Sequence, residues 1–195
     1  MNKSFSIRLL ILSLALPVAC FADSIFTLQG VLQNYAIDTS APISSANMQF
    51  LMQKAQIAIA VGNNLVESSS LKNIYQAREY APVWVEQSQW NDMAKSFSQI
   101  MLDVGSRGLL TRDYLSADLK LLLANSISPE NQWQAEILMS KAFYQLSQDL
   151  SIGRVDPQLV DQDIKYTRKP FLDAKLLPQI LAAGPSQLSA GLDFL

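Results

Sequence analysis

The chain has 195 residues and a formal net charge of −2, from 15 Lys and Arg residues against 17 Asp and Glu residues. This mildly acidic balance provides no electrostatic surface for nucleic acid or anionic lipid. A hydrophobic content of 49% excludes a largely disordered chain. The sequence contains no histidine, which excludes Ser-His-Asp and Cys-His catalysis and any histidine-ligated zinc site.

Residues 1–22 have the pattern of a secretory signal peptide. A basic start is followed by an apolar run that is too short to span a bilayer, so no membrane span is expected. A small-x-small pattern predicts cleavage after Ala22. The alternative is a lipoprotein acylated at Cys20, although Pro17 stands where lipoprotein signals usually carry Leu.

Cleavage after residue 22 leaves 173 residues, a length suited to one domain with its own core. Cys20 is the only cysteine, so the mature chain is expected to have neither a thiol nucleophile nor a disulfide. Without histidine as well, no catalytic residue, metal site or cofactor is predicted, although the 17 acids leave a lytic enzyme that uses a carboxylate pair open as a competing class.

Residues 23–70 are more weakly patterned and are interpreted as a divergent N-terminal helical segment. A first short helix is predicted where apolar residues recur every three to four positions, at Ile25, Leu28, Leu32 and Tyr35. Ser45 or Asn47 then caps a second helix, which is predicted to run through Ile59 and to end at Gly62.

The middle of the chain predicts three further helices. Each lies between a capping residue and a proline, glycine or asparagine stop, over residues 70–80, 91–104 and 116–125. Between the first two, residues 83–85 form an extended or turn-like apolar run that is too short to indicate a sheet.

The longest predicted helix spans about residues 129–152. Ser128 is a suitable N-cap, because its hydroxyl can accept from unpaired backbone N–H groups, and Gly153 is a suitable end. Two adjoining apolar rows predict burial against several partners, and one row consists of Met139, Phe143, Leu146 and Leu150. The predicted fold class is therefore all-α, a single irregular helical bundle around this long central helix.

The last residues predict two short helices separated by a stop and restart at residues 184–186. Pro178 is predicted to break the first helix or to lie in its first turn. The second ends the chain with an apolar row that we expect to be exposed, formed by Leu188, Leu192 and Leu195. An exposed row indicates a parent protein truncated at the C-terminus, self-association through this apolar end, or a separate partner.

Two arginines and three tryptophans are candidates for binding. Arg78 and Arg154 lie at helix ends, where a guanidinium binds a carboxylate or phosphate or pairs with a nearby acid such as Glu79 or Asp156. A structural role is the default for both, either hydrogen bonding to carbonyls or pairing with such an acid. Stacking on sugar rings is open to the tryptophans, with core packing the default at helical spacing: Trp84, Trp90 and Trp133.

Three motifs occur in order: YQAREYAPVW at residues 75–84, GSRGLLTRDY at residues 105–114 and GRVDP at residues 153–157. Together they resemble the N-terminal scaffold domain of the large periplasmic L,D-transpeptidases of Gram-negative bacteria. The family pattern reads Y-x-x-R-x-Y-x-P-x-W, then H-G-L-x-x-x-x-Y, then a long helix ending G-R-V-D-P. The resemblance implies structural roles for Tyr75, Arg78, Tyr80, Pro82, Trp84, Gly108, Leu109, Tyr114, Gly153, Arg154, Val155, Asp156 and Pro157.

The resemblance implies a non-catalytic scaffold domain over residues 71–195, associated with peptidoglycan cross-linking and cell-wall biogenesis in the periplasm. The parent enzymes make 3→3 cross-links between stem peptides. Expected partners are a transpeptidase catalytic domain or peptidoglycan. Arg107 stands where the family has His, and the family's catalytic histidine and cysteine motif is absent. The alternative is a periplasmic helical binding or adaptor module that recognises peptidoglycan or a protein partner.

Overall fold

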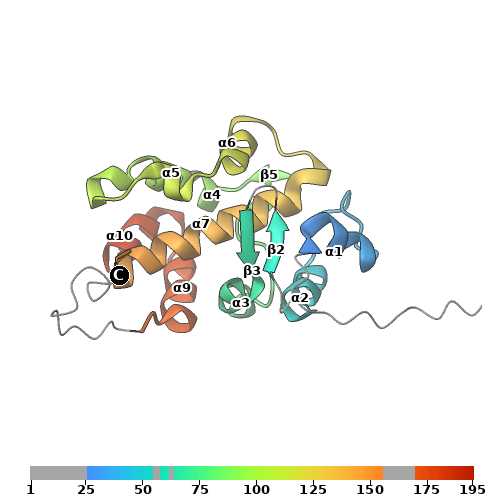
Figure 1. The fold of residues 1–195 in the computed structure, drawn as a ribbon, viewed down its shortest axis with the longest axis horizontal. Helices are drawn as coiled ribbons and strands as arrows, with labels where there is room; N and C mark the ends of the chain where they lie inside the picture. Colours follow the sequence, from blue (N-terminus) through green and yellow to red (C-terminus); the bar gives the residue numbers. More distant parts are fainter. Residues whose placement is uncertain (1–25, 55–57, 62–63, 156–169) are drawn as a thin grey trace, which may run out of the picture.

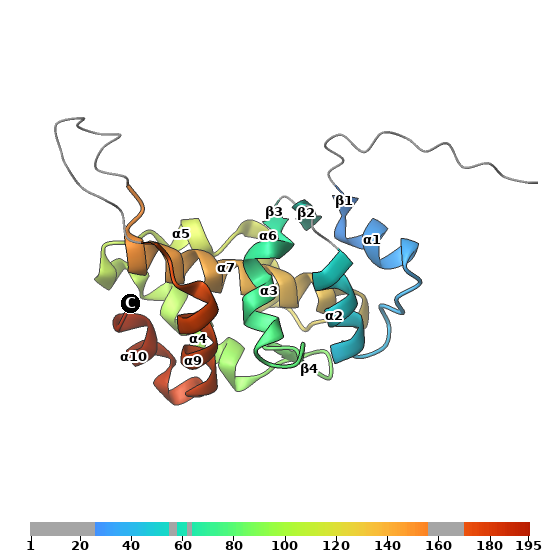
Figure 2. The same ribbon diagram turned by 90° about the horizontal axis from the view of Figure 1, so that it is seen from below.

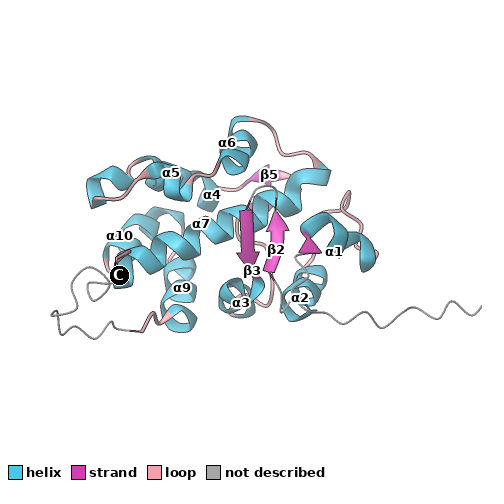
Figure 3. Cartoon of the chain, viewed as in Figure 1, coloured by secondary structure: helices cyan, strands magenta, loops and turns pink. Residues whose placement is uncertain are grey.

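The computed structural model describes residues 26–54, 58–61, 64–155 and 170–195, which form a predominantly helical fold (Figure 3). The long helix α7 (Gln132–Ile152) runs through the middle, with shorter helices on both sides of it (Figure 1). The all-α class and the central helix predicted from the sequence are therefore confirmed.

The other elements are short. The α-helices are α1 (Leu28–Asn34), α2 (Ser45–Lys54), α3 (Ser68–Gln76), α4 (Asp92–Leu102), α5 (Thr111–Tyr114), α6 (Ala117–Ala124), α9 (Asp173–Ala182) and α10 (Leu188–Asp193). The 3-10 turns are η1 (Val104–Arg107), η2 (Pro129–Asn131) and η3 (Pro185–Gln187). The strands are β1 (Phe26–Thr27), β2 (Ala58–Val61), β3 (Asn64–Glu67), β4 (Val85–Glu86) and β5 (Gln89–Trp90).

Helix α7 is largely buried because helices α3, α5, α6, α9 and α10 all pack against it. Its predicted apolar rows therefore have partners on several sides, and Phe143 and Leu146 are fully buried. Ser128 does not cap the helix as predicted, because Pro129–Asn131 form a 3-10 turn and the α-helix starts only at Gln132. Gly153 ends α7 with φ at +76°, a conformation that glycine adopts at little cost.

The N-terminal part combines helices with a small sheet. The helix predicted to run through Ile59 is wrong, because α2 ends at Lys54 and Ile59 lies in strand β2. Strand β2 pairs in parallel with β1 and antiparallel with β3, with Ile59 opposite Phe26 and Val66. β-branched side chains favour such pairing, and the buried Val61 and Val66 anchor it to the core.

Two predicted caps are confirmed in the middle of the chain. The Asn91 side chain accepts from the Ala94 N–H at 3.0 Å, and the Ser116 hydroxyl accepts from the Leu119 N–H at 3.2 Å. In the apolar run before α4, residues 83 and 84 form a bend, which fits the expected extended or turn-like run, but Val85 starts the hairpin β4–β5, which the sequence did not predict. The hairpin turn is Gln87-Ser88, and both residues have positive φ.

The C-terminal helices pack onto the core at one end of α7, and α1 and α2 lie at the other end (Figure 2). Pro178 lies inside α9 without breaking it, contrary to prediction, because buried Leu177 and Leu181 hold the helix against its neighbours. The expected exposed apolar end is also wrong. Leu188 and Leu192 are 0% and 1% exposed, and α10 contacts α4, α7 and α9.

Candidate functional site

The first motif is fastened to α7 by one buried carboxylate. Glu136 is fully buried, and its Oε1 accepts from the Val83 N–H at 2.7 Å and from the Tyr75 hydroxyl at 2.9 Å. Its Oε2 accepts from the N–H groups of Trp84 and Val85 at 3.0 and 2.9 Å. These bonds satisfy the backbone donors of three consecutive buried residues, which would lack an acceptor without Glu136.

Ser140, one helical turn after Glu136, extends this network. Its hydroxyl accepts from the Trp84 indole N–H at 2.7 Å and lies 2.6 Å from the Tyr75 hydroxyl. Trp84 packs against Phe97 and Phe143, with ring centroids 5.3 and 5.5 Å apart. Core packing is therefore confirmed for Trp84, whose side chain is fully buried.

The electrostatics of the network indicate a structural role. Burial raises the pKa of the Glu136 carboxyl, and the four hydrogen bonds from Tyr75 and the loop backbone oppose that shift. Burial also raises the pKa of the Tyr75 hydroxyl, and the neighbouring Glu136 adds to the effect. Both carboxylate oxygens are occupied and closed to solvent, so Glu136 is not placed to transfer a proton to a substrate.

The second and third motifs meet at the end of α7. Arg154 pairs with Asp113, and its Nε lies 3.6 Å from an Asp149 oxygen. The Tyr114 hydroxyl donates to the same Asp149 at 2.8 Å. The predicted pairing role of Arg154 is therefore confirmed, although its described partners are Asp113 and Asp149. The partner considered from the sequence, Asp156, lies outside the described residues.

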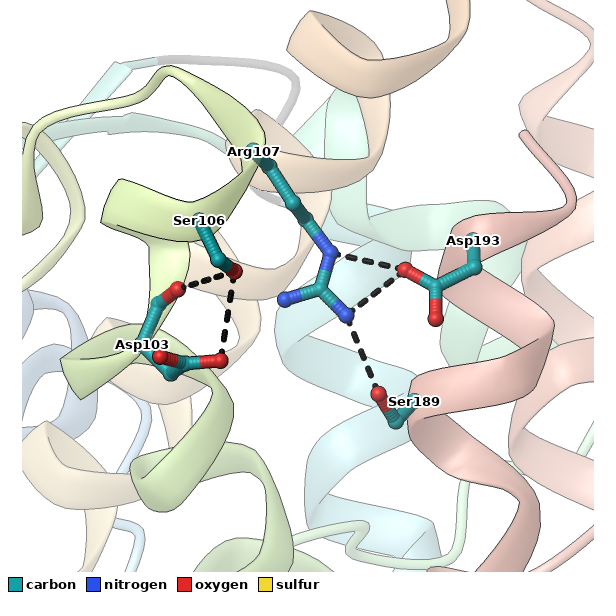
Figure 4. Close-up of polar contacts among 5 residues, drawn as sticks. All are labelled: Asp103, Ser106, Arg107, Ser189 and Asp193. Carbon is teal, nitrogen blue, oxygen red and sulfur yellow. Dashed lines mark hydrogen bonds and ion pairs between the residues drawn. The ribbon is translucent and has the colours of Figure 1, made fainter.

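Arg107, where the resembling family has histidine, joins η1 to the C-terminal helix α10 (Figure 4). Its Nε donates to Asp193 at 2.8 Å, and one terminal nitrogen lies 2.6 Å from the same carboxylate oxygen. That nitrogen also donates to the Ser189 hydroxyl at 3.0 Å. This clamp and the burial of Leu188 explain why the chain's last helix is held against the molecule.

Arg78 behaves differently from Arg154. The structure contains no ion pair between the Arg78 side chain and a described residue, and its Nε is buried without a hydrogen-bond partner. Pairing with Glu79, one of the structural roles considered from the sequence, is therefore not formed, and Glu79 and Tyr80 adopt left-handed backbone conformations directly after Arg78. The arginine instead lines a pocket of about 410 Å³, together with Pro42, Ile43, Pro82, Val85, Glu86, Gln87, Asn91 and Gln132.

The three tryptophans divide into two groups. Trp84 and Trp133 are 0% and 1% exposed, so both are core residues. Trp90 is half-buried and lines a second cleft of about 400 Å³ beside α4 and α6. Its indole N–H donates to the Leu122 carbonyl at 3.3 Å, which fixes the ring at the edge of that cleft.

The remaining motif residues are distributed along the molecule. Gly108 ends η1 with φ at +74°, Leu109 and Tyr80 pack against the core, and Val155 is 63% exposed. Asp156 and Pro157 lie outside the described residues. The sequence pattern did not identify Glu136 and Ser140, although two polar residues four positions apart within an apolar helix are a usable signal for a buried network.

The fold and this buried network define a helical module without an assembled catalytic centre among the described residues. Those residues contain no cluster of three or more possible metal ligands. A family model described as "Scaffold domain" matches residues 69–193, which is more than half of the chain. The chain therefore belongs to the scaffold-domain family, the scaffold domain of L,D-transpeptidases. Comparison with curated proteins gave no match, and comparison with solved structures gave none.

Proposed function

We propose that this protein is a periplasmic, non-catalytic scaffold for a murein L,D-transpeptidase and acts in 3→3 cross-linking of peptidoglycan. The observation that carries the proposal is the convergence of all three family motifs on α7, through Glu136, Asp149 and Arg154. A scaffold domain of this family is non-catalytic. The absence of histidine from the whole sequence supports the same role, since the parent chemistry requires a Cys-His pair.

The activity is tested with sacculi rich in tetrapeptide stems. The protein alone should produce no new cross-linked dimer and release no muropeptide, as measured by product chromatography. Added to a separately produced transpeptidase catalytic domain, it should raise the rate of dimer formation. Dimer formation by the protein alone would contradict the non-catalytic role, and an unchanged rate in the mixture would contradict the scaffolding role.

The location is tested by mass spectrometry of the periplasmic fraction. Cleavage after Ala22 gives an N-terminus at Asp23, which is the expected result for a signal peptide of this pattern. Among the described residues, no helix combines the length and apolar character needed to cross a membrane. A diacylated Cys20 would overturn the proposal of a protein released into the periplasm.

A second function, a binding or adaptor module, is supported by the pocket beside Arg78. Its lining combines apolar walls with an arginine that forms no ion pair within the described part of the chain, a composition suited to an acidic ligand. Sedimentation with purified sacculi distinguishes the two functions. An adaptor for peptidoglycan should co-sediment without any enzyme present, whereas a scaffold for the catalytic domain alone should stay in the supernatant.

A further inference from the structure

Arg78 lies at the surface of the core and forms no ion pair with any described residue. Arg154 pairs with Asp113 and Asp149, and Arg107 pairs with Asp193. The Arg78 Nε–H is buried and has no acceptor, and the structure contains no ion pair for its guanidinium within the described residues. A buried donor without a partner destabilises the folded protein, so a free acceptor is expected from outside the chain.

The surroundings of Arg78 leave room for such an acceptor. The pocket of about 410 Å³ is within the range of small-ligand sites. Pro42, Ile43, Pro82 and Val85 provide apolar walls, and Glu86 is the acidic residue of the lining. Arg78 and Glu86 thus offer one positive and one negative group to the same small volume.

Hydrogen bonds fix two walls of the pocket and occupy the side-chain amides of Gln132 and Asn91. The Gln132 amide nitrogen donates to the carbonyls of Thr39 and Ala41, which holds the loop that carries Pro42 and Ile43. The Asn91 amide nitrogen donates to the Val83 carbonyl at 2.8 Å, and its oxygen caps α4. Among these three residues, Arg78 is the one with a side-chain donor, its Nε–H, that has no hydrogen-bond partner among the described residues.

We propose that Arg78 binds the free carboxylate of a short peptide in this pocket, with Glu86 receiving a nearby ammonium group of the same ligand. A guanidinium fork matches a carboxylate in two parallel hydrogen bonds, and the apolar walls suit small side chains such as that of alanine. This site adds a ligand to the proposed function. The choice of ligand rests on that function, because stem peptides of peptidoglycan carry free carboxylates and amines.

The experiment is a calorimetric titration of the mature chain with a murein tetrapeptide that has a free C-terminal carboxylate. Amidation of that carboxylate should weaken binding at least about tenfold, because the charge-assisted pair is lost. Arg78→Met should weaken binding of the free peptide to a similar extent. Arg112→Met is the matched control, since Arg112 is exposed, lies outside the pocket and carries the same charge.

Thermal unfolding separates a binding role from a structural one. Because the Arg78 Nε–H is unpaired in the free protein, Arg78→Met should unfold at the same temperature as wild type or higher. A lower unfolding temperature with unchanged peptide affinity would overturn the proposal. Arg78→Lys, which keeps the charge but lacks the fork, provides a second test and should bind more weakly than wild type.

Further results separate a failure of the Arg78 site from a failure of the proposed function. Equal binding of L-trialanine and the murein tetrapeptide would support the carboxylate site but contradict its selectivity for peptidoglycan. If no peptide binds while the protein still raises the rate of dimer formation by the catalytic domain, the Arg78 site is wrong and the proposed scaffold function stands. Equal binding of the free and the amidated peptide would also overturn the carboxylate site.

Discussion

At the scale of single residues, Glu136 shows how one buried carboxylate organises a distant loop. Its four acceptor bonds reach residues 51–61 positions earlier in the chain. Glu136→Gln replaces one oxygen by an amide donor and leaves backbone N–H groups of the loop unpaired. We expect the free energy of unfolding to fall by about 3 kcal/mol.

Urea unfolding measures this loss. Glu130→Gln is the matched control, because Glu130 is exposed on η2 and the same change there should leave the stability nearly unchanged. If the two variants unfold at the same urea concentration, the Glu136 network does not hold the loop.

A second prediction concerns alkaline pH. Burial raises the pKa of both Tyr75 and Tyr114, and each hydroxyl also bonds a carboxylate, of Glu136 or Asp149. In the unfolded chain these tyrosines ionise near their ordinary pKa of 10.0, while in the folded chain they stay neutral. Their contribution to stability is therefore complete below pH 10 and is lost as the pH rises further, by about 1.4 kcal/mol per pH unit for each tyrosine.

Urea unfolding between pH 8 and pH 11.5 tests this slope. Tyr114→Phe should make the alkaline decline less steep, whereas Tyr35→Phe should not, because Tyr35 is 47% exposed and far from this network in sequence. A stability that stays level up to pH 11.5 in the wild-type protein would contradict the buried, neutral state of the two hydroxyls.

At the scale of elements, the turn of the hairpin β4–β5 has an unfavourable backbone conformation that lowers the free energy of unfolding. Its two turn residues, Gln87 and Ser88, have φ at +48° and +56°, a region that asparagine and glycine adopt more easily. The double change Gln87→Asn and Ser88→Gly should raise the free energy of unfolding by about 1 kcal/mol, measured by urea unfolding. A loss of stability would show that the side chains of Gln87 and Ser88 contribute more than the backbone strain removes.

The C-terminal helix α10 contributes two leucines to the core. Leu192 is 1% exposed. Its neighbour Gly191 lets α10 approach Ile180 of α9 closely, since a Cβ at Gly191 would lie 3.1 Å from the Ile180 side chain. Leu192→Ala should destabilise the protein by about 3 kcal/mol in urea unfolding. Phe194→Ala is the control on the same segment and should have little effect, because Phe194 is 84% exposed.

Deleting residues 186–195 extends this test. From the sequence, removal of an exposed apolar row would improve solubility. With Leu188 and Leu192 buried, the deletion should instead expose apolar surface on α4 and α9 and lower the unfolding temperature. An unchanged unfolding temperature would mean that α10 does not stabilise the bundle.

At the scale of the whole molecule, the N-terminal part shares one core with the residues matched by the family model. Helix α2 packs against α3, strands β2 and β3 pack against α7, and Met48, Leu51 and Leu32 are almost fully buried. A chain beginning at Ser69 should therefore unfold at least about 10 °C lower than one beginning at Asp23, as followed by circular dichroism. Equal unfolding temperatures would mean that the N-terminal part is an independent unit.

Local signals in the sequence predicted the helical class, the position of α7 and several element ends. Asn91, Ser116 and Gly153 act through caps and turns that involve only neighbouring residues, and apolar spacing reports which face of a helix is buried. The same reasoning failed at Ile59, where a short apolar run fits either a helix or a strand. It also failed at Pro178, where tertiary packing outweighed a local preference.

The candidate site depended on contacts that no local pattern contains. The sequence determined that Arg78 and Arg154 stand at helix ends, but only the tertiary structure gave Arg154 its acids and left Arg78 without one among the described residues. Only the tertiary structure likewise gave Glu136 its hydrogen-bond partners, which lie more than 50 positions earlier in the chain. Side-chain pairing of this kind depends on residues brought together from dozens of positions apart, whereas caps and periodicity act within one or two helical turns.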